Sequence, residues 1–251
     1  MLETVETVEV RRAGERFRTE NEWLESRHSF SFGPYFDPGN TGFGLLVASN
    51  DDIVAPGKGF DTHPHRDMEI VTWVLEGSLV HQDSQGNSGV IHPGLAQRMS
   101  AGAGIQHSER NDSWRLTGEP AHDDPVHFVQ MWVRPDEPGL PPSYQQRDVT
   151  ADLATGALIP IASGHTEAAV HINQRDATLY AARLHPGATV PLPPSPYLHL
   201  FLARGTATLH TTAGPADLAP GDAARLRNTD GPPITAGPTG AEILAWHMLR
   251  S

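Results

Sequence analysis

The chain has 251 residues and a hydrophobic fraction of 38%, which allows one large domain or two ordinary ones with a sizeable core. It contains no cysteine, so disulfides, thiolate nucleophiles and zinc-finger ligation are excluded. The formal net charge is −12 and Lys58 is the only lysine, so direct binding to nucleic acid or to a membrane surface is not expected.

The chain begins with residues 1–7, which are acidic and lack the apolar region of a signal peptide. No later stretch is as long and apolar as a transmembrane helix. We therefore expect a soluble, cytoplasmic protein. Helical periodicity is weak throughout, and residues 16–24 are the best candidate for a short helix.

Short apolar and β-branched runs, separated by glycine and proline, predict strands along the rest of the chain. The clearest runs are residues 44–48, 69–75, 126–133, 179–184, 198–203 and 243–247. One segment, 134–147, contains Pro135, Pro138, Pro141 and Pro142. Because proline has no N–H to donate to a sheet, we expect this segment to stay outside the sheets as a linker between two domains.

The two halves of the chain share a spacing. Gly77 is followed by a Pro-Gly turn at Pro93 after 16 residues, and Gly205 is followed by a Pro-Gly turn at Pro220 after 15. A duplicated barrel explains this repeat, the length of the chain and the central linker. The predicted fold class is therefore all-β, with two antiparallel β-barrel domains. Their bounds are 1–133 for the N-terminal barrel, 134–147 for the linker and 148–251 for the C-terminal barrel.

The strongest chemical signal is a His-x-His pair, His63 and His65, followed by a His-x-Glu pair, His107 and Glu109. Side chains two residues apart in a strand point to the same side, so each pair presents two ligands to one space. If the strands are neighbours, three imidazole nitrogens and one carboxylate oxygen converge. That set suits iron, manganese, cobalt, nickel or copper. One such pair could arise by chance among 14 histidines, but two pairs that each follow a glycine-rich turn are harder to explain in that way.

Around these ligands the sequence resembles a known family. Gly57, His63, His65 and Glu69 form a Gly-x5-His-x-His-x3-Glu pattern that is similar to the cupin signature. Longer motifs resemble the pirin family more specifically, strongly over about residues 20–145 and weakly beyond. These motifs are RHSFSF at 27–32, HPHRDME at 63–69, HPG at 92–94, MSAG at 99–102, GIQHSE at 104–109, QMWV at 130–133 and PSYQ at 142–145.

The resemblance implies a bicupin, in which two antiparallel barrels of the cupin type face each other and only the N-terminal barrel holds a metal ion. It assigns the metal ligands to His63, His65, His107 and Glu109. The general cupin pattern would nominate Glu69 instead. In pirins that position is not the main carboxylate ligand, so Glu69 stays outside the predicted set.

The second half of the chain lacks these ligands. Alignment on the glycine of the repeat places Pro191 and Pro193 opposite the His-x-His pair. Alignment on the Pro-Gly turn places Ile234 and Ala236 opposite the His-x-Glu pair. None of these four side chains can ligate a metal, so the second barrel is expected to be free of metal.

For bacterial pirins the resemblance implies a quercetin 2,3-dioxygenase that depends on one divalent transition metal. We take iron as the first candidate, with manganese, cobalt, nickel, copper or zinc as alternatives. The charge of the ion acidifies the 3-hydroxyl of a flavonol, and Glu109 is the candidate general base for that proton. Reaction of the flavonolate with O2 then opens the heterocycle and releases carbon monoxide.

Two other functions remain open at this stage. One is a metal- or redox-sensing module that binds a partner protein, as a transcriptional coregulator or as a modulator of a metabolic enzyme. The other is a dioxygenase for a different enolizable aromatic substrate. The acidic charge permits a protein partner but argues against direct contact with DNA.

Overall fold

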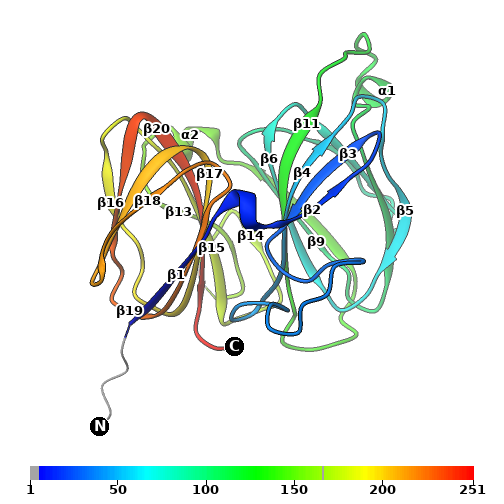
Figure 1. Cartoon of the computed structure of the whole chain (residues 1–251). Helices are drawn as coiled ribbons and strands as arrows, with labels where there is room; N and C mark the ends of the chain where they lie inside the picture. The colour runs from blue at the N-terminus through cyan, green and yellow to red at the C-terminus, as the bar shows by residue number, and fades with distance from the viewer. Residues whose placement is uncertain (1–5, 166) are drawn as a thin grey trace.

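The computed structural model describes residues 6–165 and 167–251, and nearly all of its regular structure is β-strand. Two barrels stand side by side (Figure 1). The predicted all-β class with two barrels is therefore confirmed. Residues 1–5, on which most of the signal-peptide argument depends, lie outside the described residues.

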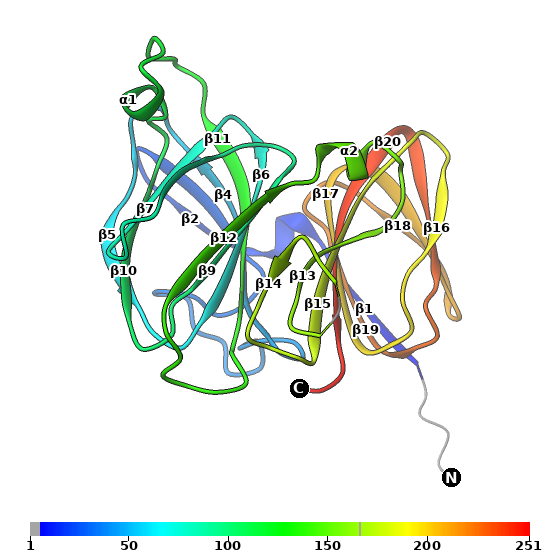
Figure 2. The ribbon, with the colours of Figure 1, turned by 180° about the vertical axis from the view of Figure 1, so that it is seen from behind.

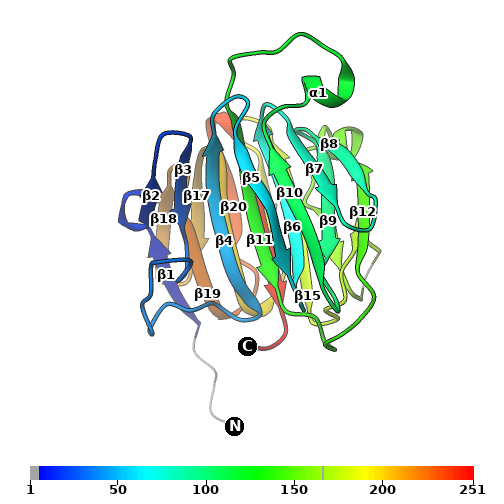
Figure 3. The ribbon, with the colours of Figure 1, turned by 90° about the vertical axis from the view of Figure 1, so that its right-hand side faces the viewer.

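The first barrel is built from two antiparallel sheets. The larger sheet runs in the order β12 (Ser143–Asp148), β9 (Leu95–Ser100), β6 (Glu69–Glu76), β11 (Val126–Val133), β4 (Leu46–Val54), β3 (Leu24–His28) and β2 (Phe17–Glu20). The smaller sheet runs in the order β5 (Gly59–His65), β10 (Ile105–Arg110), β7 (Leu79–Asp83) and β8 (Ser88–Ile91). Figure 3 looks onto this smaller sheet.

The second barrel is one curved sheet, antiparallel except between β13 and β14. Its order is β1 (Thr7–Arg11), β19 (Ala223–Thr229), β17 (Ser195–Thr211), β20 (Pro233–Met248), β15 (Ala177–Leu184), β13 (Ile159–Ser163) and β14 (Val170–His171), with β16 (Thr189–Pro191) on β20 and β18 (Gly214–Leu218) on β17. The short helices are η1 (Ala13–Glu15), α1 (Trp114–Thr117) and α2 (Thr150–Leu153). No helix in the described part of the chain is long and apolar enough to span a membrane.

Strands β6 and β11 lie at the centre of the larger sheet, and both faces of each are covered. Val71 and Trp73 pack in the core shared with the second barrel, whereas Val74 packs inside the first barrel. A strand that is buried on both faces is apolar at almost every position. This explains why the apolar runs 69–75 and 126–133 predict these two strands to within one residue.

The two barrels share an apolar core in which Trp73, Met131 and Trp246 are fully buried. Both indole N–H groups find partners across the interface. Trp73 Nε1 donates to Glu242 Oε1 at 2.8 Å, and Trp246 Nε1 donates to Met131 Sδ at 3.2 Å. Glu242 also accepts a hydrogen bond from Arg183 Nε at 3.0 Å, so the buried carboxylate is paired as well as desolvated.

The proline-rich segment 134–147 is not wholly a linker. Its last residues belong to β12, which pairs with β9 from Ser143 opposite Ser100 to Asp148 opposite Leu95. Figure 2 shows β12 beside β9 in the first barrel. The expectation that the whole segment stays outside the sheets is therefore wrong for residues 143–147. The prolines end at Pro142, so the strand that follows keeps all its backbone N–H groups.

The N-terminal strand crosses to the other barrel. β1 pairs with β19 in the second barrel, from Thr7 opposite Arg227 to Arg11 opposite Ala223 (Figure 1). Arg12 follows it and donates to Asp222 Oδ2 at 2.7 Å. Each barrel thus contains a strand from the other half of the chain. The boundaries at 133 and 148 remain a prediction, and a division by sequence alone does not describe this exchange.

Residues 16–24 do not form the expected helix. They form β2, a turn and the start of β3, and Phe17 lies opposite His28 in the antiparallel register. In the turn, Asn21 Oδ1 accepts the backbone N–H groups of Trp23 and Leu24 at 3.0 and 2.9 Å. Such side-chain bonds offer the backbone an alternative to helical hydrogen bonds.

The predicted repeat has a conformational basis. Gly77 and Gly205 have φ angles of 72° and 71°, and Gly94 and Gly221 in the Pro-Gly turns have φ angles of 92° and 84°. A Cβ on Gly205 would lie 2.0 Å from the carbonyl oxygen of Gly240. Only glycine adopts such a conformation without strain, which explains the matched spacing.

Candidate metal centre and its cavity

Three of the four predicted ligands meet in one tight group. β5 carries His63 and His65, and β10 carries His107, which lies opposite His63 in the antiparallel register. The ring centroids of His63 and His107 are 4.5 Å apart, and the other two pairs are 4.9 Å apart. One nitrogen from each ring lies within 4.8 Å of the other two. The prediction that the two strands are neighbours is confirmed.

The rings present unused lone pairs. His63 Nδ1 lies 2.7 Å from the carbonyl oxygen of Asp61, so Nδ1 carries the proton and Nε2 is left as an acceptor. The Nε2 atoms of His65 and His107 are buried and have no hydrogen-bond partner among the described residues. Burial, reinforced by the neighbouring imidazoles, lowers the pKa of His65 to about 4 and that of His107 to about 3. Neutral imidazole is the form that binds a metal ion.

Glu109 lies beside this group rather than within it. The β10 register shifts between His107 and Glu109, and both side chains remain buried. Gln130 Nε2 donates to both carboxylate oxygens of Glu109 at 2.8 Å, and Trp132 Nε1 donates to Gln130 Oε1 at 3.0 Å. One oxygen of this carboxylate lies within 4.8 Å of a ring nitrogen of His107 and of a ring nitrogen of His81. Glu109 is thus positioned by Gln130 at the edge of the three-histidine group.

Sequence reasoning missed His81, which is fully buried on β7 behind His107. Its Nδ1 lies 3.4 Å from His107 Nδ1, and its Nε2 lies 3.1 Å from Asp83 Oδ2. A proton on His81 Nε2 then points to Asp83, and a proton on His107 Nδ1 points to His81. This arrangement leaves the His107 Nε2 lone pair facing the other histidines. The signal in the sequence was a His-x-Asp pair, which is weak in a chain with 14 histidines.

The donor set fits a first-row transition-metal ion. Imidazole nitrogens with a nearby carboxylate suit such ions, whereas magnesium and calcium favour oxygen ligands. A buried nitrogen without a partner costs free energy, and a cation would give His65 and His107 the partner they lack.

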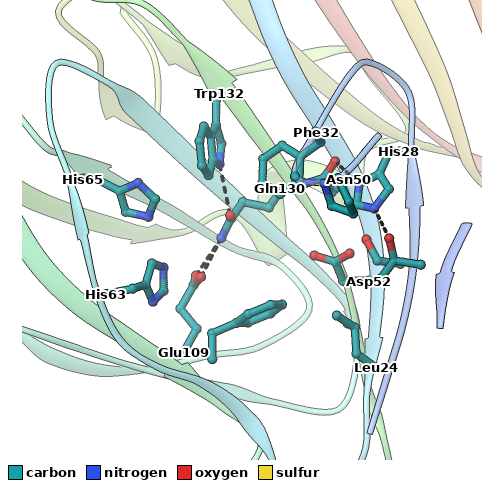
Figure 4. Close-up of a pocket in the computed structure, with 15 residues that line it drawn as sticks. Leu24, His28, Phe32, Asn50, Asp52, His63, His65, Glu109, Gln130 and Trp132 are labelled. Carbon is teal, nitrogen blue, oxygen red and sulfur yellow. Dashed lines mark hydrogen bonds between the residues drawn. The ribbon is translucent and has the colours of Figure 1, made fainter. Parts of the chain in front are cut away.

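A cavity of about 260 Å³ lies next to the histidines inside the first barrel. Its apolar wall includes Leu24, Phe32, Phe60 and Trp132. Trp132 packs edge-on against His65 and Phe32, with ring centroids 4.9 and 5.2 Å away. Figure 4 shows His63, His65 and Glu109 on one side of the cavity and His28, Asn50 and Asp52 on the other. Such a space suits a small, flat aromatic molecule.

Glu69 does not face this cavity. It is buried on β6, where Ser100 Oγ donates to Oε2 at 2.7 Å and Asn173 Nδ2 donates to Oε1 at 3.0 Å. Asn173 comes from the second half of the chain, so Glu69 serves the contact between the barrels. This orientation agrees with its omission from the predicted ligands.

The positions that correspond to the ligands in the second half carry no donor. Ile234 and Ala236 are buried in an apolar core that fills the second barrel. Pro191 pairs with Pro233 at the end of β16, and Pro193 follows that strand. The second barrel therefore packs apolar side chains at two of these positions and proline at the other two.

A family model and several curated proteins match the chain. The family model described as Pirin matches residues 8–133. A Mycobacterium tuberculosis protein named "Putative quercetin 2,3-dioxygenase Rv0181c" is 55% identical over 244 residues, which are 96% of this chain and 95% of that protein. An Escherichia coli protein named quercetin 2,3-dioxygenase is 42% identical over 171 residues, which are 68% of this chain and 69% of that protein.

The chain is also similar in structure to solved bacterial proteins. The crystal structure of YhhW from Escherichia coli has a TM-score of 0.85 and 31% identity, and the match covers 98% of this chain and 99% of that one. A crystal structure described as the bacterial pirin YhhW in complex with nickel(II) has a TM-score of 0.84 and 31% identity, covering 98% of this chain and 100% of that one.

Proposed function

The chain belongs to the pirin family, and from this premise we propose that it is a metal-dependent dioxygenase that cleaves a flavonol such as quercetin. The observation that carries the proposal is the pair of buried, unpartnered Nε2 atoms on His65 and His107 beside an aromatic cavity. The name of the Escherichia coli relative supports the substrate class.

In this proposal His63, His65 and His107 hold one divalent transition metal, with Glu109 as the fourth ligand or as a free base. When bound, the ion supplies positive charge that favours loss of the proton from the 3-hydroxyl of the flavonol. Iron is the first metal to test, and the YhhW complex makes nickel the second.

The residues of the chain then have separate tasks. Glu109 takes the proton of the 3-hydroxyl, and Gln130 keeps its carboxylate aimed along the cavity. Trp132 and Phe32 hold the flat rings of the flavonol and exclude water. Both atoms of O2 enter the ring-opened product, and one ring carbon leaves as carbon monoxide.

The test combines metal analysis with gas measurements. Wild-type protein is loaded in turn with Fe(II), Mn(II), Co(II), Ni(II) and Cu(II), and oxygen uptake and carbon monoxide release are recorded with quercetin. In at least one metal-loaded form, we expect one molecule of carbon monoxide to be released for each molecule of O2 consumed. That form should contain about one metal ion per chain. His107→Ala should lose both the ion and the reaction. His210→Ala, which removes an exposed histidine of the second barrel, should keep both.

Two results would contradict parts of the proposal. Equal rates in wild type and His107→Ala would refute the assignment of the site. A protein that holds its ion but consumes no oxygen with any flavonol would refute the dioxygenase activity and favour a regulatory metal-binding module.

A further inference from the structure

Asp52 places a buried carboxyl group on the cavity wall across from the histidines. β4 lies between β3 and β11, and Asp52 is opposite Ser26 on one side and Phe128 on the other. Its side chain lines the same cavity as His63 and Glu109, and the residue is only 4% exposed. Figure 4 shows its carboxyl group directed into the space between the two walls.

One oxygen of this carboxyl group is left without a partner in the described part of the chain. Asp52 Oδ1 is buried and makes no hydrogen bond among the described residues, whereas the side chain of Ser26 hydrogen-bonds to the carboxyl group. A buried polar atom without a partner costs free energy, so Asp52 Oδ1 is suited to a hydrogen bond with a polar group of a ligand in the cavity. The apolar neighbours Leu24 and Phe60 cannot supply the partner.

The other polar groups on this wall already have partners. His28 Nδ1 lies 2.9 Å from Asn50 Oδ1, and His28 Nε2 lies 2.9 Å from Thr19 Oγ1. With the ring proton on Nδ1, His28 donates to Asn50 and accepts from Thr19. On this wall, Asp52 Oδ1 is the buried side-chain oxygen that has no hydrogen-bond partner among the described residues.

Asp52 can act as a donor as well as an acceptor. Burial raises its pKa to about 7; the hydrogen bond from Ser26 opposes this shift, and the charges of Asp51 and Glu109 add to it. A carboxyl group that is partly protonated at neutral pH can donate its proton to a phenolate or accept the proton of a phenol.

We infer that Asp52 binds a ring hydroxyl of the ligand at the end of the cavity away from the three histidines. The inference rests on the proposed function, because it assumes an aromatic ligand that presents its 3-hydroxyl to the histidines. It adds a specificity rule: the site prefers flavonols that carry a further hydroxyl on another ring. Asp52 is then a binding residue for a group that takes no part in the reaction.

The test compares two ligands under anaerobic conditions, where no turnover occurs. Quercetin carries ring hydroxyls besides its 3-hydroxyl, and 3-hydroxyflavone carries the 3-hydroxyl alone. Their dissociation constants for the metal-loaded protein are measured by quenching of tryptophan fluorescence. In wild type we expect quercetin to bind about tenfold more tightly, the effect of one well-placed hydrogen bond in a buried site.

Asp52→Leu should bring this ratio close to one, mainly by weakening quercetin binding. Asp52→Asn, which keeps a donor and an acceptor, should retain most of the preference. Thr19→Val removes a hydroxyl that already has a partner on the same wall and should change the ratio less than twofold. Asp52→Ala replaces the leucine variant if that variant fails to fold, as judged by circular dichroism and metal content.

The outcomes separate this inference from the proposed function. A ratio in Asp52→Leu within twofold of the wild-type ratio overturns the role of Asp52, even if wild type consumes oxygen with quercetin. A second outcome is that wild type and the Asp52 variants show the expected ratios of the two dissociation constants while no oxygen is consumed in air. In that case the binding role of Asp52 stands and the dioxygenase activity is refuted. If neither flavonol binds to wild type, both are overturned.

Discussion

Replacement of Asp52 by asparagine should make the protein more stable at pH 8, and this advantage should fade as the pH falls toward 4. Burial raises the pKa of Asp52 from 3.8 to about 7 in the folded protein, and the unfolded chain has the ordinary value. Between these two values the folded protein keeps a proton that the unfolded chain has released. The free energy of unfolding of the wild type therefore decreases as the pH rises through this window.

The magnitude follows from the size of the shift. A difference of about 3 pKa units, at about 1.4 kcal/mol for each unit, corresponds to about 4 kcal/mol over the whole window. About 3 kcal/mol of this should develop between pH 5 and pH 8. Asparagine has the same shape and no charge at any pH, so the variant lacks this contribution. Below about pH 3 the carboxyl group is protonated in both states, and the contribution is absent from the wild type too.

The assay is urea unfolding of both proteins at pH 5, 6, 7 and 8, followed by tryptophan fluorescence with a chelator present, so that no bound cation acts near Glu109. Asp148→Asn is the control, because Asp148 is exposed and a hydrogen bond from the backbone N–H of Thr150 lowers its pKa. That variant should not gain stability at high pH. A difference between wild type and Asp52→Asn that stays constant from pH 5 to pH 8 would refute the reasoning.

Two further predictions concern the metal centre and its support. His81→Leu should weaken metal binding about 10- to 100-fold, measured by competition with a chromophoric chelator, because His107 loses the partner that orients it; unchanged affinity would show that His81 does not position the ligand. Gly102→Ala should lower the melting temperature by several degrees in calorimetry, because φ is +46° and the new Cβ would lie 2.0 Å from the carbonyl oxygen of Leu140. Gly14→Ala, where a Cβ meets no atom within 4 Å, should have no such effect.

The sequence predicts best what is local. His63 and His65, like His107 and Glu109, are two residues apart, and strand geometry alone places each pair on one side of a sheet. The central strands β6 and β11 are equally predictable, because burial on both faces requires a run of apolar residues. The pairing of β5 with β10 needed only the assumption that strands with matching ligands are neighbours, and the register confirms it.

Features that depend on distant partners are not predictable in this way. β1 leaves its own half of the chain to pair with β19, and β12 follows a proline-rich stretch into the first barrel. The sequence of either short segment does not predict its partner strand, because a strand of five or six residues can pair with the edges of many sheets. The same holds for Glu69, whose direction is set by Asn173 in the other half of the chain.

Asp51 and Asp52 show why the polar group on the far wall of the cavity is not predictable from the sequence. They are consecutive on β4, so strand alternation points them to opposite faces. Burial raises the pKa of Asp51, but the hydrogen bond from His127 and the charge of Arg16 lower it below its ordinary value overall. Asp52 faces the cavity and forms no salt bridge with an arginine or lysine among the described residues, and burial leaves its pKa raised. Two identical neighbours thus acquire opposite chemistry from strands far away in the sequence. Of the two, Asp52 keeps an oxygen, Oδ1, that has no partner among the described residues and can hydrogen-bond to a ligand.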